Sequence, residues 1–377
     1  MRYYIIAGEA SGDLHGSHLI KALIQGDKEA VLRGWGGDLM EQAGMILVQH
    51  YRDMAYMGVW QVIKHLPSIL GKLKACKADI QRFQPDALIL IDYSGFNLRI
   101  APWAKKQGLK VYYYISPQVW ATRAKRVKTI RQSVDHVFSI LPFEKAFYEQ
   151  YNYGVTYVGH PLLDVVAAHI PKAHFRATYG LDERPIIALL PGSRKQEIRS
   201  MLPAMLGVVD YFPNYQFVVA AAPSIPASFY EHYLMNAPRA VLIPQQTYDI
   251  LQHSHAALVT SGTATLETAL FNVPQVVCYK AGPLMYALAK RLIKVRFIAL
   301  VNLIMDKKIV PECIQKQVQP STLKSNLEPL LKGNERAEML AAYEDLHQKL
   351  GVPGAAQRTA AYLQERLRFA LPPTKDL

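Results

Sequence analysis

A short turn in the second half of the chain combines residues that could bind an anion. In AALVTSGTATLETALFNVP, residues 256–274, an apolar run breaks at Ser261-Gly262-Thr263 and then resumes with helical spacing. This pattern predicts a strand, a tight turn and a helix. The first N–H groups of such a helix lack partners and lie at the positive end of its dipole, so a diphosphate could bind there. Glu267, one helical turn further on, could reach a sugar hydroxyl.

A second turn of the same kind lies upstream. The apolar run at residues 186–190 is followed by Pro191-Gly192-Ser193-Arg194 and then by polar sequence with helical character. The arginine suits bidentate contact with a phosphate. Glycine and serine also occur in such turns for conformational reasons alone, so neither turn is diagnostic by itself. The pair indicates a nucleotide-diphosphate site.

Polar side chains follow two strand-like runs in the first half. GEASGDLHG, residues 8–16, places Glu9, Asp13 and His15 where the carboxyl edge of a parallel sheet binds ligands. Its spacing differs from the GxGxxG dinucleotide fingerprint. The alternative is structural, because Asp13 could cap a helix and Glu9 could bind the backbone of the turn.

IDYSGFN, residues 91–97, ends another apolar run. It holds Asp92 where a carboxylate could take a proton from a substrate hydroxyl. Ser94 or Asn97 could instead cap the helix that follows.

A basic segment lies nearby. SPQVWATRAKRVKTIR, residues 116–131, sets Trp120 among five basic residues that include Arg123 and Arg126. These basic residues cannot all share one helix face, so part of the run is solvated surface.

An apolar segment lies further upstream. MAYMGVWQVIKHLPSIL, residues 54–70, is more apolar than a surface loop requires, with Met57, Val59 and Trp60 among its large side chains. It is either a core helix or a surface for an acyl chain or a membrane.

Composition limits the class of protein. The chain of 377 residues, 50% apolar and 19% charged, can form two domains of ordinary size. It contains no apolar run of about 18 residues, and its first residues become polar after a few apolar ones, so we expect neither a membrane span nor a secretory signal. Three cysteines without metal spacing fit a reducing cytoplasm. The net charge of +13 indicates an anionic partner: nucleic acid, a phosphorylated substrate or an acidic membrane face.

The spacing of apolar runs predicts an α/β protein. In the first half they occupy 3–7, 87–91, 111–115 and 137–140, with helical segments between them. The second half repeats the alternation at 186–190, 217–221, 240–243, 256–259 and 275–279. We therefore expect two Rossmann-like domains facing each other across a cleft. From residue 323 to about 369 the pattern is helical, apart from a break at 351–354.

Two motifs of other nucleotide enzymes are missing. No two aspartates are separated by a single residue, and no Walker-type GKS or GKT occurs. Metal-dependent sugar-nucleotide enzymes commonly use an Asp-x-Asp pair. The sequence therefore favours a site without metal or cofactor, in which Arg194 and the two helix ends stabilise a leaving diphosphate.

Taken together, the motifs resemble those of lipid-A-disaccharide synthases. GEASGD, MGVWQVI, IDYSGFN, SPQVWA, LPFEKAFY with GHPLLD, LLPGSR, SGTATLE, and NLI followed by VPE occur in the same order over nearly the whole chain. The resemblance implies a GT-B fold and an inverting transfer from UDP-diacylglucosamine to diacylglucosamine 1-phosphate, which forms a β-1,6 disaccharide and UDP. The residues that would hold UDP are Gly192, Ser193, Arg194, Ser261, Gly262, Thr263, Ala264 and Glu267, with Asn302 and Glu312 nearby.

Two positions depart from the family pattern. Many members have an aspartate, the usual catalytic candidate, where this chain has Gly95, so Asp92 or Glu9 is the expected base. Thr122 replaces an aromatic residue after SPQVWA. The residues expected to contact the acceptor or the membrane are Met57, Val59, Trp60, Trp120, Arg123 and Arg126.

The resulting prediction is a cytoplasmic glycosyltransferase on the inner face of the inner membrane of a Gram-negative bacterium. Residues 1–170 would bind the acceptor and residues 171–350 the UDP-sugar. Residues 351–377 would pack back on the first domain or on a partner in a homodimer. The alternatives are another UDP-sugar glycosyltransferase or an epimerase of the same fold, and a basic nucleic-acid-binding protein.

Overall fold

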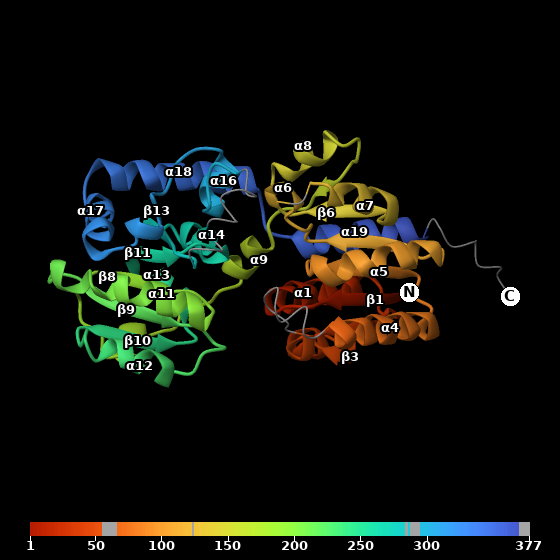
Figure 1. Cartoon of the computed structure of the whole chain (residues 1–377), viewed down its shortest axis with the longest axis horizontal. Coiled ribbons are helices and arrows are strands. Elements are labelled where there is room, and N and C mark those ends of the chain that lie inside the picture. Colours follow the sequence, from red (N-terminus) through yellow and green to blue (C-terminus); the bar gives the residue numbers. More distant parts are fainter. Residues whose placement is uncertain (55–65, 123, 283–285, 287–294, 369–377) are drawn as a thin grey trace. The chain divides into compact units, whose positions relative to one another are not determined.

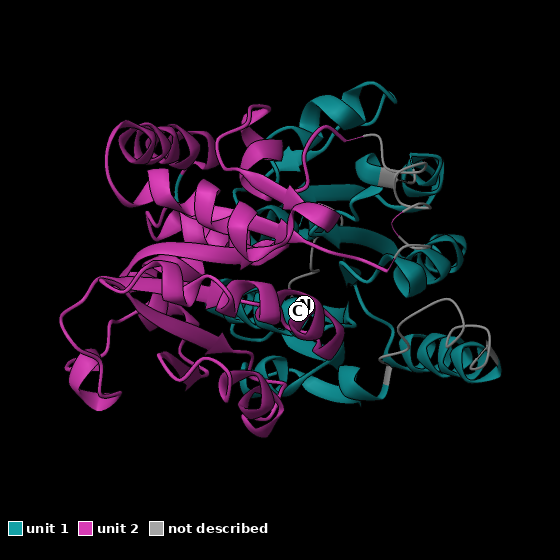
Figure 2. Ribbon diagram, turned by 60° about the vertical axis from the view of Figure 1, so that its left-hand side comes forward, with its two compact units in different colours: residues 1–161, 352–377 teal, residues 162–351 magenta. Residues whose placement is uncertain are grey.

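The computed structural model describes residues 1–54, 66–122, 124–282, 286 and 295–368. The chain forms two compact units, coloured separately in Figure 2: Met1–Pro161 with Val352–Leu377, and Leu162–Gly351. The sequence-based boundaries lie at 170 and 350. Among the described residues, no helix is both long and apolar enough to cross a membrane.

Unit 1 contains a seven-stranded parallel sheet in the order β3-β2-β1-β4-β5-β6-β7. The strands are β1 (Arg2–Ala7), β2 (Val31–Gly36), β3 (Ile46–His50), β4 (Ala87–Ile91), β5 (Lys110–Tyr114), β6 (His136–Ser139) and β7 (Thr156–Tyr157). All five residues of β4 are buried, as expected for a central strand with helices on both faces.

Helices cover both faces of this sheet (Figure 1). They are α1 (Ala10–Gly26), α2 (Asp38–Gln42), α4 (Leu66–Phe83), α5 (Ser94–Lys106), α6 (Val119–Thr122), α7 (Arg126–Ser133), α8 (Glu144–Glu149) and α19 (Ala355–Arg368), with a 3-10 turn η1 (Tyr51–Met54). One core cluster joins Tyr3 and Ile5 of β1 to α1 and α19. The alternate residues Tyr4 and Ile6 face the second cluster, formed with α4, α5 and α7.

The last helix belongs to the first unit. Helix α19 packs along α1, and the Gln364 side-chain amide donates to the carbonyl of Leu23 (2.8 Å). The Arg358 guanidinium donates to the carbonyl of Val158 (2.8 Å). Buried apolar residues such as Leu363 and Leu367 complete the contact.

Unit 2 contains a six-stranded parallel sheet in the order β10-β9-β8-β11-β12-β13. The strands are β8 (Ile186–Leu190), β9 (Gln216–Ala221), β10 (Ala240–Pro244), β11 (Ser254–Thr260), β12 (Gln275–Tyr279) and β13 (Glu312–Ile314). The helices are α9 (Pro161–Ala167), which starts at the unit boundary, α10 (Phe175–Thr178), α11 (Lys195–Leu206), α12 (Ser228–Leu234), α13 (Thr247–Gln252), α14 (Thr263–Leu270), α16 (Leu300–Met305), α17 (Pro320–Leu331) and α18 (Asn334–Leu350), with 3-10 turns η2 (Val209–Tyr211) and η3 (Gln315–Gln317).

Each sheet has a point where the direction of strand addition reverses. In unit 1 this point lies between β1 and β4, and in unit 2 between β8 and β11. The loops that leave the two strands there run to opposite faces of the sheet, which opens a crevice at its carboxyl edge. The four loops at these two points are the four motifs that the sequence singled out for chemistry.

Candidate active site

A pocket of about 300 Å³ lies at the reversal point of unit 2. It is built from the ends of β8, β9 and β11 and the starts of α11, α13 and α14. Its lining consists of Leu190, Gly192, Ser193, Arg194, Glu197, Ala220, Ala222, Pro223, Thr247, Thr260, Ser261, Gly262, Thr263, Ala264 and Glu267. The eight residues expected to hold UDP directly all line this pocket.

The N-terminus of α14 supplies the open anion-binding end of the pocket. Among the described residues, no side chain caps this helix. The amide of Thr265 donates to the carbonyl of Gly262 (3.2 Å), and an α-helix offers no intrahelical acceptor to the amides of Thr263 and Ala264. The Ser261 hydroxyl points away from these groups and donates to the carbonyl of Ile298 (2.9 Å). The amides at the start of α14 are therefore available to a diphosphate.

At the N-terminus of α11, Glu197 binds the turn that precedes the helix. Glu197 Oε2 accepts from the backbone amides of Ser193 (3.0 Å) and Arg194 (3.2 Å). Glu197 Oε1 accepts from the Arg194 guanidinium (2.9 Å). Gly192 has φ +112°, and a Cβ there would lie 2.6 Å from the same carboxylate. At this helix end Glu197 therefore holds the two amides of the turn and the guanidinium of Arg194, which lines the pocket.

Glu267 is the second carboxylate that lines the pocket, beside Glu197. The Tyr248 hydroxyl donates to its Oε1 (2.9 Å), and burial raises the pKa of Glu267. Thr247 and Tyr248 were absent from the sequence-based site. They follow β10, so the rule that ligands bind at the carboxyl ends of strands would have found them.

Asn302 and Glu312 lie outside the pocket lining and brace the segment behind it. The Glu312 carboxylate accepts from the backbone amides of Ile298 (3.1 Å) and Ala299 (3.0 Å) and from the side-chain amide of Asn302 (2.9 Å). Asn302, fully buried, accepts in turn from the backbone amide of Val310 (2.9 Å). Because Ile298 is the acceptor for Ser261, this network supports the turn at the start of α14.

Unit 1 brings two carboxylates to its own reversal point. Asp92 follows β4 and Glu9 follows β1, and β1 and β4 are neighbours in the sheet. Burial, and secondarily the charge of Glu9, raises the pKa of Asp92 to about 6. Glu9 is exposed. A Cβ added at Gly95 would meet no atom within 4 Å, so this position leaves room for a side chain to begin.

Asp13 and His15 of the GEASGDLHG segment serve the fold. The Asp13 carboxylate accepts from the amides of Gly37 (2.9 Å), Leu39 (3.2 Å) and Met40 (3.0 Å), so it caps α2 rather than its own helix. Burial lowers the pKa of His15 to about 4. At neutral pH His15 is an uncharged core residue.

Comparison with known proteins decides the family. A family model described as lipid-A-disaccharide synthetase matches residues 3–365. The chain is 41% identical over 364 residues to the lipid-A-disaccharide synthase of Syntrophus aciditrophicus, covering 94% of this chain and 95% of that protein. It is 38% identical to that of Geobacter metallireducens, with 97% of each covered. The chain belongs to the lipid-A-disaccharide synthetase family.

Solved structures show the fold that this family member shares. A UDP-GlcNAc 2-epimerase from Neisseria meningitidis, bound to UDP-GlcNAc, matches with a TM-score of 0.71 and 12% identity over 97% of this chain and 100% of that one. The calicheamicin glycosyltransferase CalG4 matches with a TM-score of 0.62 and 13% identity over 98% and 99%. The predicted family, the α/β fold of GT-B type and the class of UDP-sugar glycosyltransferase are confirmed. The family match does not favour an epimerase or a nucleic-acid-binding protein.

The residues expected at the acceptor or the membrane are only partly described. Met57, Val59, Trp60 and Arg123 lie outside the described residues. Trp120, half-buried, packs edge-to-face on Phe143, with ring centroids 5.0 Å apart.

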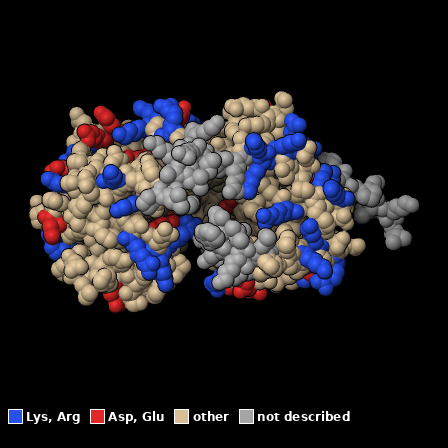
Figure 3. All heavy atoms as spheres, viewed as in Figure 1, with Lys and Arg blue, Asp and Glu red and all other residues tan. Residues whose placement is uncertain are grey.

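The basic segment continues into α7, which packs on α5. Arg126 donates to the Ser94 hydroxyl (3.1 Å). Lys125 and Lys128 are exposed. Figure 3 shows Lys and Arg side chains spread over the visible face of unit 1.

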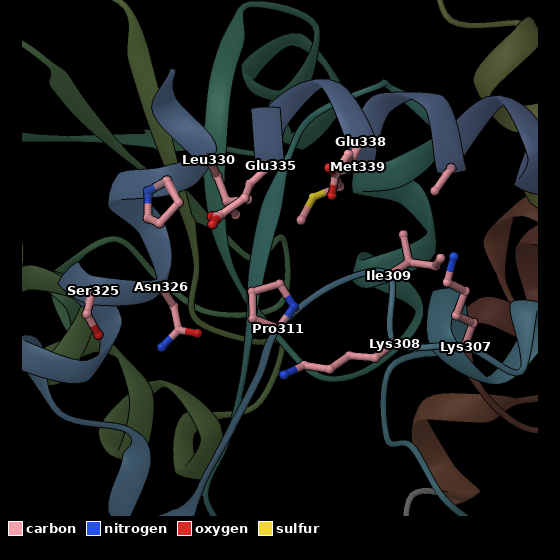
Figure 4. Close-up of a pocket in the computed structure, with 12 residues that line it drawn as sticks. Lys307, Lys308, Ile309, Pro311, Ser325, Asn326, Leu330, Glu335, Glu338 and Met339 are labelled. Atoms are coloured by element: carbon pink, nitrogen blue, oxygen red, sulfur yellow. The ribbon is translucent and has the colours of Figure 1, made fainter. Parts of the chain in front are cut away.

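A second pocket, of about 450 Å³, lies in unit 2 between the segment before β13 and helices α17 and α18 (Figure 4). Lys307 and Lys308 line one side, and Glu335 and Glu338 of α18 line another. None of the predicted site residues lines this pocket. In the described residues, no three His, Cys, Asp or Glu side chains are grouped as metal ligands would be.

Proposed function

We propose that this chain transfers diacylglucosamine from UDP-2,3-diacylglucosamine to 2,3-diacylglucosamine 1-phosphate, giving a β-1,6 lipid A disaccharide phosphate and UDP. Membership of the family supports this reaction. The structural observation that carries it is the uncapped N-terminus of α14 inside the pocket between β8 and β11.

The donor nucleotide would occupy this pocket. The amides at the start of α14 bind the diphosphate, and Glu267 accepts a hydrogen bond from a ribose hydroxyl. Arg194 exchanges its bond to Glu197 for a bond to a phosphate oxygen, which costs little because its side chain is 57% exposed. Both contacts to the diphosphate strengthen as negative charge grows on the leaving group.

The acceptor hydroxyl would be activated by a carboxylate of unit 1. Its oxygen forms the new bond to the anomeric carbon of the donor, while the bond from that carbon to the diphosphate oxygen breaks. The electron pair leaves with UDP, and the hydroxyl proton passes to Asp92. A carboxylate with a pKa of about 6 is ionised at neutral pH and is still a stronger base than an ordinary aspartate. Glu9 is the second candidate.

The lipid substrates would be taken from an anionic membrane surface. Between Tyr93 and Val134 the chain has nine Lys or Arg residues and no Asp or Glu. Cations at such a density attract anionic headgroups, with a contribution of about 1 kcal/mol each. Apolar side chains of the segment that holds Val59 and Trp60 would insert beside them.

Product analysis tests the reaction. The protein is incubated with the defined donor and acceptor, and a disaccharide phosphate and UDP are expected in equal amounts by mass spectrometry. UDP-N-acetylglucosamine, supplied alone, should be recovered unchanged. Conversion of that sugar to its 2-epimer, without disaccharide formation, would establish the epimerase alternative.

A further inference from the structure

The turn that carries Asp92 has an unusual backbone. Asp92 and Tyr93, which connect β4 to α5, both have φ +41°. Neither is glycine, and two adjacent left-handed residues are costly, at about 1 kcal/mol or more each. Such a turn persists only where its surroundings hold it.

Two fully buried side chains bind the carbonyl of Asp92. The Tyr113 hydroxyl, from the neighbouring strand β5, donates to this oxygen at 2.5 Å. The Asn97 side-chain amide, from the first turn of α5, donates to the same oxygen at 2.9 Å. Both bonds are made to the backbone and not to the carboxylate, so they fix the turn without occupying the reactive group.

The next residue is fixed from the other side. A Cβ at Gly8 would lie 2.2 Å from the ring of Tyr93, so this ring rests directly on the backbone that joins β1 to α1. The Tyr93 ring also stacks on Phe96, with centroids 5.6 Å apart. The loop that carries Glu9 and the turn that carries Asp92 are thus held against each other.

We propose that Tyr113 and Asn97 are positioning residues for the reaction, because together they hold the left-handed turn that presents the Asp92 carboxylate at the carboxyl edge of the sheet. This inference rests on the proposed role of Asp92 as the base. It assigns to both residues an effect on the chemical step that acts through Asp92.

Tyr113→Phe tests the proposal because it removes one donor and keeps the ring. The rate constant kcat should fall on the order of tenfold, whereas the KM for the donor and the affinity for UDP should stay unchanged. The pH at which activity reaches half its maximum should also shift, since the carboxylate changes its surroundings. Tyr153→Phe is the matched control, because its hydroxyl makes a comparable bond to the carbonyl of Val134 (3.0 Å) away from the turn.

A double-mutant cycle separates positioning from general stability. In the Asp92→Asn background, Tyr113→Phe should cause no further loss of kcat, since there is no base left to position. An equal loss in both backgrounds, or a wild-type kcat in Tyr113→Phe, would overturn the proposal. If Tyr113→Phe does not fold, Asn97→Ser replaces it in the same cycle. A wild-type rate in Asp92→Asn itself would instead reject the proposed base.

Discussion

The hydroxyl of Tyr248 donates a hydrogen bond of 2.9 Å to Oε1 of Glu267, at the wall of the donor pocket. The bond joins α13 to α14 and orients a half-buried carboxylate. Its second oxygen remains for a ligand hydroxyl. The contact therefore sets the geometry with which this site can recognise a ribose.

Glu267→Ala should weaken UDP binding by on the order of tenfold or more, because the ribose hydroxyl loses its acceptor. Tyr248→Phe should weaken it by a smaller factor, since the carboxylate stays but loses its orientation. Calorimetric titration with UDP measures both. Tyr343→Phe is the control, because its hydroxyl donates to the carbonyl of Val273 (3.3 Å) and does not line the pocket. An unchanged UDP affinity of the Glu267→Ala variant would show that the ribose does not bind Glu267.

Arg194→Ala should lower turnover by on the order of a hundredfold, because the guanidinium contact strengthens as the diphosphate leaves. Steady-state kinetics should show the loss in kcat. The free energy of unfolding should change little, because the ion pair between Arg194 and Glu197 is exposed on the Arg194 side. Arg199→Ala, on the same helix but outside the pocket lining, should keep its activity. Equal activity of the two variants would mean that Arg194 does not contact the leaving group.

Activity should rise with pH through about 6, because burial raises the pKa of Asp92 to that value and only the ionised carboxylate accepts a proton. Asp92→Asn should abolish this limb of the pH profile and lower kcat by about a hundredfold. Glu9→Gln, as the parallel variant, should keep the limb and shift it to lower pH, since one negative neighbour is removed. If Glu9→Gln abolished the pH-dependent limb and Asp92→Asn only shifted it, Glu9 would be the base.

The same pKa affects folding. A carboxyl whose pKa is raised in the folded state stabilises it below the unfolded pKa, and this contribution is lost as pH rises through 6. Asp92→Asn should therefore raise the free energy of unfolding at pH 8 by about 3 kcal/mol and change it little at pH 4. Urea unfolding at the two pH values checks the sign.

The wild-type protein should bind anionic vesicles, release them in high salt, and bind neutral vesicles poorly. The double variant Lys125→Glu with Lys128→Glu should bind anionic vesicles more weakly than the wild type. Vesicle sedimentation measures this. Lys21→Glu with Lys28→Glu reverses two exposed charges of unit 1 outside the basic segment and should have a smaller effect. Replacing Val59 and Trp60 with Ser should reduce vesicle binding without changing UDP affinity. Equal binding to neutral and anionic vesicles at every salt concentration would reject the electrostatic part of the proposal.

The sequence by itself determined where the chemistry-bearing turns lie. Ser261-Gly262-Thr263 and Asp92 each follow an apolar run that can only be a buried strand, and the helical spacing begins directly after them. Strand, turn and helix are encoded by neighbours within a few residues, so pattern alone locates them. Because the strand ends of α/β proteins bind ligands, the sequence predicts that these residues belong to the site.

Only the tertiary structure decided which polar groups in those turns are free to act. Asp13 is committed to α2, and Asn302 and Glu312 brace the backbone near Ile298. Tyr113 reaches the carbonyl of Asp92 from the neighbouring strand. The residues in each of these pairs are separated in the sequence, or they meet through a side-chain geometry that sequence spacing does not specify. A carboxylate beside a helix end can act as a cap, a brace or a base, and only the atoms packed around it select among these roles.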